Sequence, residues 1–127
     1  MISFASFKME DGSPIYMQII MYIKHGMIAG TIENGDELPS RRLLSALLGV
    51  NPNTVQKAYR LLEDEGLIAS HSGAKSYVVL SGEVLDQIKT ELLEADARSA
   101  VRALRRMGVN LEEAGKLLEK YWKEEEL

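Results

Sequence analysis

The chain has 127 residues and a formal net charge of −4, because acidic residues outnumber basic ones. This length allows one domain with a modest core, or a small domain with an appendage. The absence of cysteine excludes disulfides and thiolate metal sites. The sequence has no signal-peptide pattern and no apolar run long enough to span a bilayer, so we expect a cytoplasmic protein without a membrane partner.

A first helix is predicted between Pro14 and Gly30. Proline suits the first turn of a helix, where its missing N–H needs no partner, and glycine is favoured just after a helix end. Between them, apolar residues recur at steps of three and four, which indicates one buried helical face. Residues 1–13 and 33–36 contain turn-forming residues, and we expect both segments to be irregular.

Two further helices joined by a tight turn are predicted next. Ser40 is a favourable N-cap for a short helix that ends at Gly49. Asn51 caps the following helix, Pro52 fits its first position, and Gly66 is typical of its C-terminal end. The residues predicted to face inward are Leu44, Leu47 and Leu48 in the short helix, and Val55, Ala58, Tyr59 and Leu62 in the next.

The remainder of the chain predicts a hairpin and two helices. The β-prone runs 67–70 and 76–80 flank a glycine-containing connection. Three helices followed by a hairpin form a winged helix-turn-helix, so we assign residues 1–80 to this domain. Residues 83–107 lack proline and glycine, keep helical spacing, and are followed by a capping-box pattern that opens a final helix. The predicted fold is mainly α with a small β-hairpin, and residues 81–127 form a two-helix C-terminal dimerisation region.

Positive charge is concentrated in the helix pair. The stretch from Leu38 to Leu62 has four basic residues and no acidic one. Residues 1–80 contain seven basic and eight acidic residues, whereas residues 81–127 contain eight basic and eleven acidic residues. A helix pair with local positive charge is typical of a surface that binds phosphate. We therefore expect double-stranded DNA as the partner, despite the acidic total.

The turn before the second helix of this pair has the residue types needed to contact DNA bases. In a helix-turn-helix, the second helix enters the major groove by its N-terminal end, where free N–H groups and the helix dipole also favour phosphate. Two arginines in the first turn of the preceding helix oppose its dipole, which indicates an anionic partner. The candidate DNA-binding residues from this reasoning are Arg41, Arg42, Asn53, Thr54, Gln56 and Lys57, with Lys75 in the hairpin.

Simpler interpretations of these residues stay open. The turn at Asn51 could serve only as a helix cap, and the arginine pair and Lys75 could be solvated surface residues. The two histidines are far apart in sequence, and no catalytic constellation is recognisable. We therefore predict no enzyme activity, no metal and no cofactor.

Several motifs, in the right order, resemble the GntR family of bacterial transcription regulators. They are Pro14-Ile-Tyr-x-Gln-Ile, Asn34-Gly-Asp-x-Leu-Pro-Ser, Arg42-x-Leu44, Gly49-Val-Asn-x-Asn-Thr-Val55, Ala58-Tyr59, Leu62-Glu63 and Glu65-Gly66-Leu67. The two-helix end is similar to that of the short YtrA-like subfamily. This resemblance implies a homodimeric DNA-binding regulator, often one that represses its own operon. It does not identify a small-molecule effector.

The resemblance also implies roles for individual residues. DNA contacts are implied for Arg42, Asn51, Asn53, Thr54 and Gln56, and for Gly73 at the tip of the wing. The wing of the family usually reads Gly-basic-Gly-Thr, whereas this chain reads Gly73-Ala-Lys-Ser76, so the basic residue is shifted and the second glycine is absent. Position 41 is often not basic in the family, and we expect Arg41 to add a phosphate contact.

The segment after position 80 predicts pairing of two chains. A helix over residues 83–107 would be about 37 Å long, more than a small domain needs, and its apolar stripe has little core to cover in a monomer. The main hypothesis is a sequence-specific repressor that binds a palindromic operator as a homodimer. The alternative is a winged-helix protein–protein interaction module that does not bind DNA. The predicted dimerisation residues are Leu85, Ile88, Leu92, Ala95, Leu104, Leu117, Leu118 and Tyr121.

Overall fold

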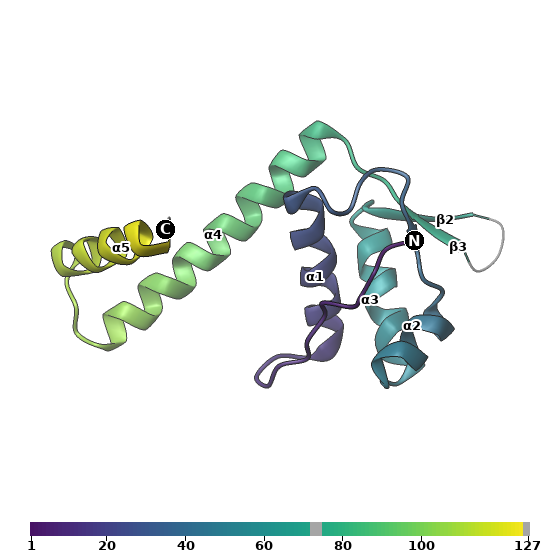
Figure 1. The fold of residues 1–127 in the computed structure, drawn as a ribbon, viewed down its shortest axis with the longest axis horizontal. Helices are drawn as coiled ribbons and strands as arrows, with labels where there is room; N and C mark the ends of the chain where they lie inside the picture. The colour runs from purple at the N-terminus through teal and green to yellow at the C-terminus, as the bar shows by residue number, and fades with distance from the viewer. Residues whose placement is uncertain (72–74, 126–127) are drawn as a thin grey trace. The chain divides into compact units, whose positions relative to one another are not determined.

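The computed structural model describes residues 1–71 and 75–125 (Figure 1). Its elements, in chain order, are α1 (Ile15–Ala29), β1 (Glu37–Leu38), α2 (Arg41–Leu48), α3 (Pro52–Asp64), β2 (Ile68–His71), β3 (Lys75–Val78), α4 (Gly82–Arg106) and α5 (Leu111–Glu125). The predicted fold class, mainly helical with a small β-hairpin, is confirmed.

The chain forms two compact units, Met1–Ile88 and Lys89–Leu127. The first unit contains the helix pair and the sheet, and the second contains most of α4 and all of α5. Because the division between the units falls inside α4, the domain boundary that we placed at residue 80 stays a prediction.

Local capping explains where the helix pair begins and turns. Ser40 Oγ accepts a hydrogen bond from the backbone N–H of Leu43 at 3.1 Å, and Asn51 Oδ1 accepts one from the N–H of Asn53 at 2.8 Å. Gly49 ends α2 with a φ of 67°, in the left-handed region where glycine is favoured. Ser40 therefore fixes where α2 begins, and Gly49 and Asn51 fix the tight turn between α2 and α3.

The core of the first unit lies between the helices. Helices α1 and α3 pack side by side, as Figure 1 shows, and α2 packs on α3. Tyr59 is fully buried, and its hydroxyl donates a 2.7 Å hydrogen bond to the carbonyl oxygen of Pro39. Burial raises the pKa of this hydroxyl, whereas the nearby Arg41 guanidinium acts to lower it. The fully buried helical residues of this core are Ile19, Ile23, Met27, Leu44, Val55, Ala58, Tyr59 and Leu62.

Among the residues that the structure describes, the sheet has three strands, whereas the sequence predicted only the β2–β3 hairpin. The strand order is β1-β3-β2, and both pairings are antiparallel. Strand β1 has only two residues, too few to produce a recognisable alternation of apolar and polar side chains. Its pairing register with β3, Glu37 to Tyr77 and Leu38 to Ser76, is a long-range feature that local pattern cannot indicate.

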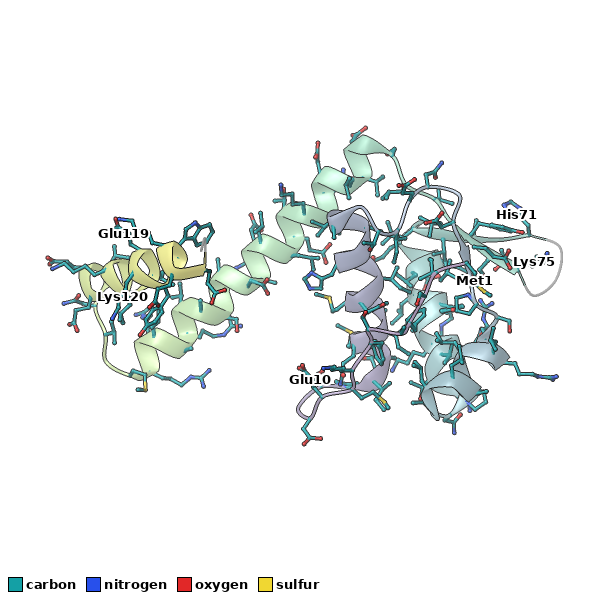
Figure 2. The ribbon with its side chains drawn as sticks, in the orientation of Figure 1. Met1, Glu10, His71, Lys75, Glu119 and Lys120 are labelled. Atoms are coloured by element: carbon teal, nitrogen blue, oxygen red, sulfur yellow. The ribbon has the colours of Figure 1, made fainter. Side chains whose placement is uncertain are left out.

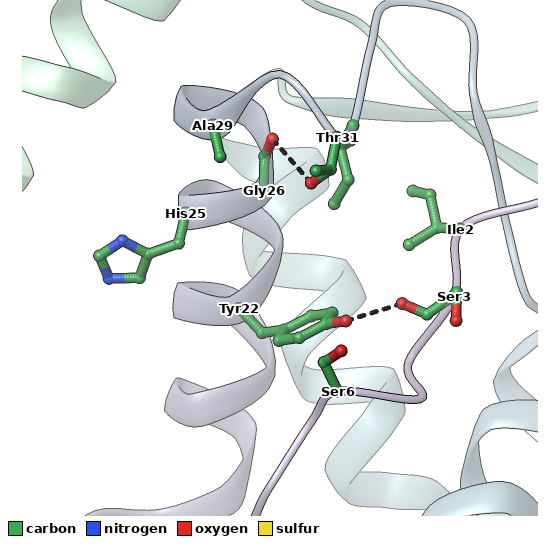
Figure 3. A pocket seen from close by; sticks show the side chains of 9 residues that line it. Ile2, Ser3, Ser6, Tyr22, His25, Gly26, Ala29 and Thr31 are labelled. Carbon is green, nitrogen blue, oxygen red and sulfur yellow. Dashed lines mark hydrogen bonds between the residues drawn. The ribbon is translucent and has the colours of Figure 1, made fainter.

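The N-terminal segment, residues 1–13, has no helix or strand, as predicted, but it packs firmly on α1. Ile2 and Phe4 are buried, and the Phe4 ring stacks on the Tyr22 ring with centroids 4.9 Å apart. The Tyr22 hydroxyl donates a 2.8 Å hydrogen bond to the backbone carbonyl oxygen of Ser3 (Figure 3). A pocket of about 400 Å³ lies along this contact between the segment and α1.

The inward orientation predicted for Leu47 is wrong. Leu47 is 63% exposed, whereas Leu44 on the same helix is fully buried. The buried face of α2 is formed by Leu44 and Ser45 with the half-buried Leu48. Because successive helical residues are rotated by about 100°, Leu47 points roughly 100° away from the centre of this face.

The two leucines of α2 provide a matched test of this packing. We expect Leu44→Ala to lower the free energy of unfolding by about 2–5 kcal/mol, because it leaves a cavity in the core. Leu47→Ala removes the same atoms from an exposed position, and its effect should stay within about 0.5 kcal/mol. Urea denaturation of both variants measures the difference. Similar losses in the two would show that Leu47 also packs against the core.

Candidate nucleic-acid interface

The N-terminal end of α3 is uncovered at the surface of the first unit. Asn51, Pro52 and Asn53 are exposed and Thr54 is half-buried, whereas Val55 lies in the core. Among the described helices, α1, α2 and α3 have no acidic residue in their first turns, while α4 and α5 do. The free N–H groups and the positive dipole end of α3 are therefore not offset by a first-turn carboxylate, and they favour an anion.

Asn51 has a defined structural role at this end. Its side-chain oxygen accepts from the N–H of Asn53, and its backbone oxygen accepts from the N–H of Thr54 at 2.9 Å. Its side-chain NH₂ group is the part left for another partner. Within the described part of the chain, the side chains of Asn53, Thr54 and Gln56 have no hydrogen-bond partner, so they too are available.

Basic residues continue along the exposed side of α3. The Lys57 ammonium lies 4.0 Å from the centre of the Tyr16 ring of α1, a cation–π contact that holds the charge near the start of both helices. Gln56 and Lys57 are exposed, and so is Arg60, which lies one turn beyond. Arg60 is one of the four basic residues between Leu38 and Leu62, but no role was predicted for it. Its helical spacing from Lys57 was the available signal.

The two arginines of α2 differ in their surroundings. Arg42 is exposed and makes no ion pair with any residue that the structure describes. The side chain of Arg41 is only 25% exposed, and its Nη2 lies 2.8 Å from Oε1 of Glu63. Its guanidinium carbon also lies 5.1 Å from the centre of the Tyr59 ring. Arg42 is therefore available to an external anion, while Arg41 already has an anionic partner inside the protein.

The hairpin contributes one described basic residue. Lys75 is exposed at the start of β3 and pairs in register with His71 of β2. Figure 2 labels both residues on the two strands of the hairpin. The predicted wing-tip residue Gly73 lies outside the described residues. Of the two candidate wing residues, Lys75 is therefore described and Gly73 is not.

The predicted dimerisation residues differ in exposure. Ile88 and Leu92 are buried within the chain, Leu85 and Leu104 are half-buried, and Ala95 is exposed. In α5, Leu117, Leu118 and Tyr121 are 42%, 55% and 54% exposed. The predicted set left out other large exposed apolar residues: Leu93 and Val101 of α4, Met107 directly after it, and Leu111 and Trp122 of α5.

Apolar surface is also present inside the second unit. A pocket of about 500 Å³ between α4 and α5 is lined by Val101, Leu104, Leu111 and Leu118, among others. The dimerisation residues were predicted from one row of apolar residues at helical spacing, and this row does not include Val101 or Leu111. Their signal in the sequence was their apolar character on helices that a monomer has little core to cover.

Other kinds of site are not supported in the described part of the chain. These residues include no group of three or more His, Asp or Glu side chains that could hold a metal ion. None of the described helices is both long and apolar enough to pass through a bilayer. In the pocket beside α1, the Tyr22 and Thr31 hydroxyls already donate to backbone oxygens, of Ser3 and Gly26 respectively.

The fold and the exposed α3 end define a winged helix-turn-helix DNA-binding protein. The family model described as "Bacterial regulatory proteins, gntR family" matches residues 15–78. The HTH-type transcriptional repressor YtrA of Bacillus subtilis (strain 168) is 37% identical over 111 residues, which cover 87% of this chain and 81% of the relative.

Solved structures agree with this match. A GntR family transcriptional regulator from Listeria monocytogenes has a TM-score of 0.77 and 31% identity, covering 88% of this chain and 98% of its own. YtrA from Sulfolobus acidocaldarius, a GntR-family transcription factor, has a TM-score of 0.55 and 35% identity, covering 75% of this chain and 99% of its own. The chain belongs to the GntR family: it is a transcriptional regulator with a DNA-binding helix-turn-helix, not an enzyme.

Replacement of Asn51 tests its capping role apart from any DNA contact. We expect Asn51→Ala to lower the free energy of unfolding by about 0.5–2 kcal/mol, because the N–H of Asn53 loses its acceptor. Asn51→Asp should retain stability, since a carboxylate caps equally well. As a control, Asn53→Ala should change stability by less than about 0.5 kcal/mol. Chemical denaturation without DNA measures all three. An unchanged Asn51→Ala variant would contradict the capping role.

Proposed function

We propose that this chain is a homodimeric repressor that binds a palindromic operator, with one winged helix-turn-helix on each half-site. The observation that carries the proposal is the exposed α3 N-terminus, which has no acidic residue in its first turn. The name of its Bacillus subtilis relative, a transcriptional repressor, supports repression. Its place of action would be the cytoplasm, because a bacterial chromosome lies there.

In the proposed complex, α3 enters the major groove by its N-terminal end. Asn53 and Thr54 have short polar side chains that bond base edges or nearby phosphates, and Gln56 pairs with adenine in bidentate fashion. The side-chain NH₂ group of Asn51 donates to the same surface. All four lie at or near the uncovered start of α3, where no described side chain competes for them.

Basic side chains around this end contact the sugar–phosphate backbone. Arg42 lies in the first turn of α2, and Lys57 is held over the Tyr16 ring on the exposed side of α3. Lys75 provides a cation at the hairpin, and Gly73 belongs to the proposed wing contact by family resemblance. Phosphate contacts position the protein but do not select a sequence, so specificity rests on α3.

The second unit provides the proposed dimer interface. Leu117, Leu118 and Tyr121 of α5, together with Val101 and Leu111, present apolar surface. Burying one large apolar side chain contributes about 1.5–3 kcal/mol. Several such side chains are needed, because association costs about 4–15 kcal/mol in translational and rotational freedom. The buried Ile88 and Leu92 have little surface left to contribute, so the exposed residues would carry most of this interface.

DNA binding can be tested without knowledge of the operator. Wild-type protein is used to select duplexes from a random-sequence pool, and the selected duplex then serves in gel shifts. We expect Arg42→Ala combined with Thr54→Ala to abolish specific binding, since a phosphate contact and a base-edge contact are lost together. Wild-type binding should weaken by orders of magnitude between about 50 and 200 mM salt.

The matched control is Arg98→Ala, which removes one exposed charge from the second unit. It should bind the selected duplex like the wild type. Wild-type affinity of the double variant would refute the assignment of α3 as the reading element. Failure of the wild type to select any duplex would refute sequence-specific binding and favour a protein–protein interaction module.

Pairing through α5 can be tested with Leu118→Glu. Leu118 is 55% exposed in a single chain and also borders the apolar pocket between α4 and α5, and the substitution would place a charge in the proposed apolar interface. We expect the wild type to be a dimer at micromolar concentration and Leu118→Glu to be a monomer, measured by light scattering. Lys116→Gln makes the same change in net charge and should remain dimeric. A monomeric wild type would overturn this part of the proposal.

A further inference from the structure

We propose that Arg41 is a positioning residue: it fixes the β2–β3 hairpin to α2 and α3, and so sets the placement of the wing relative to the recognition helix. The inference rests on the proposed DNA-binding function and assigns Arg41 a role other than the phosphate contact expected from the sequence. It depends on a cluster of four side chains, Arg41, Glu63, Ser70 and Ser76, which we call the Arg41 cluster.

The Arg41 cluster joins four elements through short polar contacts. Arg41 Nη2 donates to Glu63 Oε1 at 2.8 Å, and Arg41 Nη1 lies 3.5 Å from Ser76 Oγ. The same Glu63 oxygen accepts from the Ser70 hydroxyl at 2.9 Å, and the two serine oxygens are 3.3 Å apart. One guanidinium therefore connects the first turn of α2 to the end of α3 and to both strands of the hairpin.

The geometry requires arginine in particular. The planar guanidinium presents separate N–H groups to Glu63 and Ser76, while its face lies 5.1 Å from the Tyr59 ring centre. A lysine ammonium has its three donors on one nitrogen and no planar face, so it does not reproduce an arrangement in which two separate nitrogens meet Glu63 and Ser76 beside the Tyr59 ring. Arg41 Nε is buried without a hydrogen-bond partner among the described residues. Such a donor is costly, which is consistent with a side chain held in place by its other contacts.

Strand register connects the cluster to the wing. Ser70 and Ser76 are directly opposite each other on β2 and β3, and the next pair along the hairpin is His71 with Lys75. Ser76 is only 1% exposed, so the cluster contacts the hairpin on its buried face. The Ser70–Ser76 pair is directly followed by the pair that contains Lys75, the proposed wing contact. Loss of Arg41 or Glu63 would therefore allow this part of the hairpin to move.

A direct phosphate contact by Arg41 predicts a different outcome. Phosphate would have to compete with a carboxylate 2.8 Å from Nη2. Removing that carboxylate would then free Arg41 and strengthen DNA binding. If Arg41 instead positions the hairpin, removing Glu63 should weaken binding, as removing Arg41 does. The sign of the Glu63 effect separates the two roles.

The test measures affinity for the duplex selected by the wild type, with Glu63→Gln, Arg41→Gln and the double variant. We expect each single variant to weaken binding about two- to tenfold, and the double variant to be no weaker than either single one, because coupled partners are not additive. The slope of log affinity against log salt should stay unchanged, whereas loss of a phosphate contact reduces it by about 1.

Two controls sharpen this test. Asp64→Asn removes the same charge one residue away at an exposed position, and it should not weaken binding. Arg41→Lys keeps the charge but does not offer two separate nitrogens to the two partners, so it should behave like Arg41→Gln. Stronger binding by Glu63→Gln, or a reduced salt slope in Arg41→Gln, would overturn the proposal and support direct phosphate contact.

A second measurement does not depend on DNA. Amide hydrogen exchange in the free protein should show faster exchange of β2 and β3, relative to α1, in Glu63→Gln and Arg41→Gln but not in Asp64→Asn. Unchanged hairpin exchange would overturn the positioning role even if DNA binds. Failure of the wild type to select a duplex would refute the proposed function, while the exchange measurement would still decide whether the cluster holds the hairpin.

Discussion

The structure depends on one constraint: α3 must pack at the centre of the core on one face and remain exposed as the recognition helix on the other. Helical periodicity makes this possible, because residues three and four apart share one face. The buried face is Val55, Ala58, Tyr59 and Leu62, and the residues left at the surface include Asn53, Gln56, Lys57 and Arg60. Helices α1 and α2 pack on the first face. Any element covering the other face would stabilise the fold and abolish access to DNA.

The acidic residues of α3 are confined to its C-terminal end. Three consecutive acids, Glu63, Asp64 and Glu65, stand at its C-terminal end, where negative charge opposes the helix dipole. Two of them have partners that offset this cost: Glu63 holds Arg41 of α2, and Glu65 lies 3.0 Å from the buried Lys24 ammonium of α1. Glu63 and Glu65 therefore bind neighbouring helices, while the first turn of α3 contains no acidic residue. An acidic protein can in this way keep a surface suited to phosphate.

Features set by neighbouring residues were predictable from sequence, and features set by distant ones were not. The caps at Ser40 and Asn51 and the turn at Gly49 are local, so the helix pair was predicted correctly. The partner of Arg41 is Glu63, 22 residues away, and nothing in the local pattern shows that they meet. The short strand β1 and the burial of Phe4 depend equally on tertiary contacts. For the candidate site, sequence indicated the exposed start of α3. It could not distinguish Arg42, which has no ion-pair partner among the described residues, from Arg41, which pairs with Glu63.

The first unit has no excess of positive charge, so the proposed dimer is important for DNA affinity. The seven basic and ten acidic residues of this unit, positions 1–88, cannot produce strong non-specific attraction to DNA. When two such units are linked, binding of the first to DNA holds the second close to its half-site. The resulting high effective concentration of the second unit raises the overall affinity without any new contact, and so compensates for the weak charge attraction. The exposed apolar residues of α4 and α5 would supply that link, and the excess of acids in the same helices would discourage contact with phosphate. Selectivity then follows, because only a duplex with two correctly spaced half-sites engages both units.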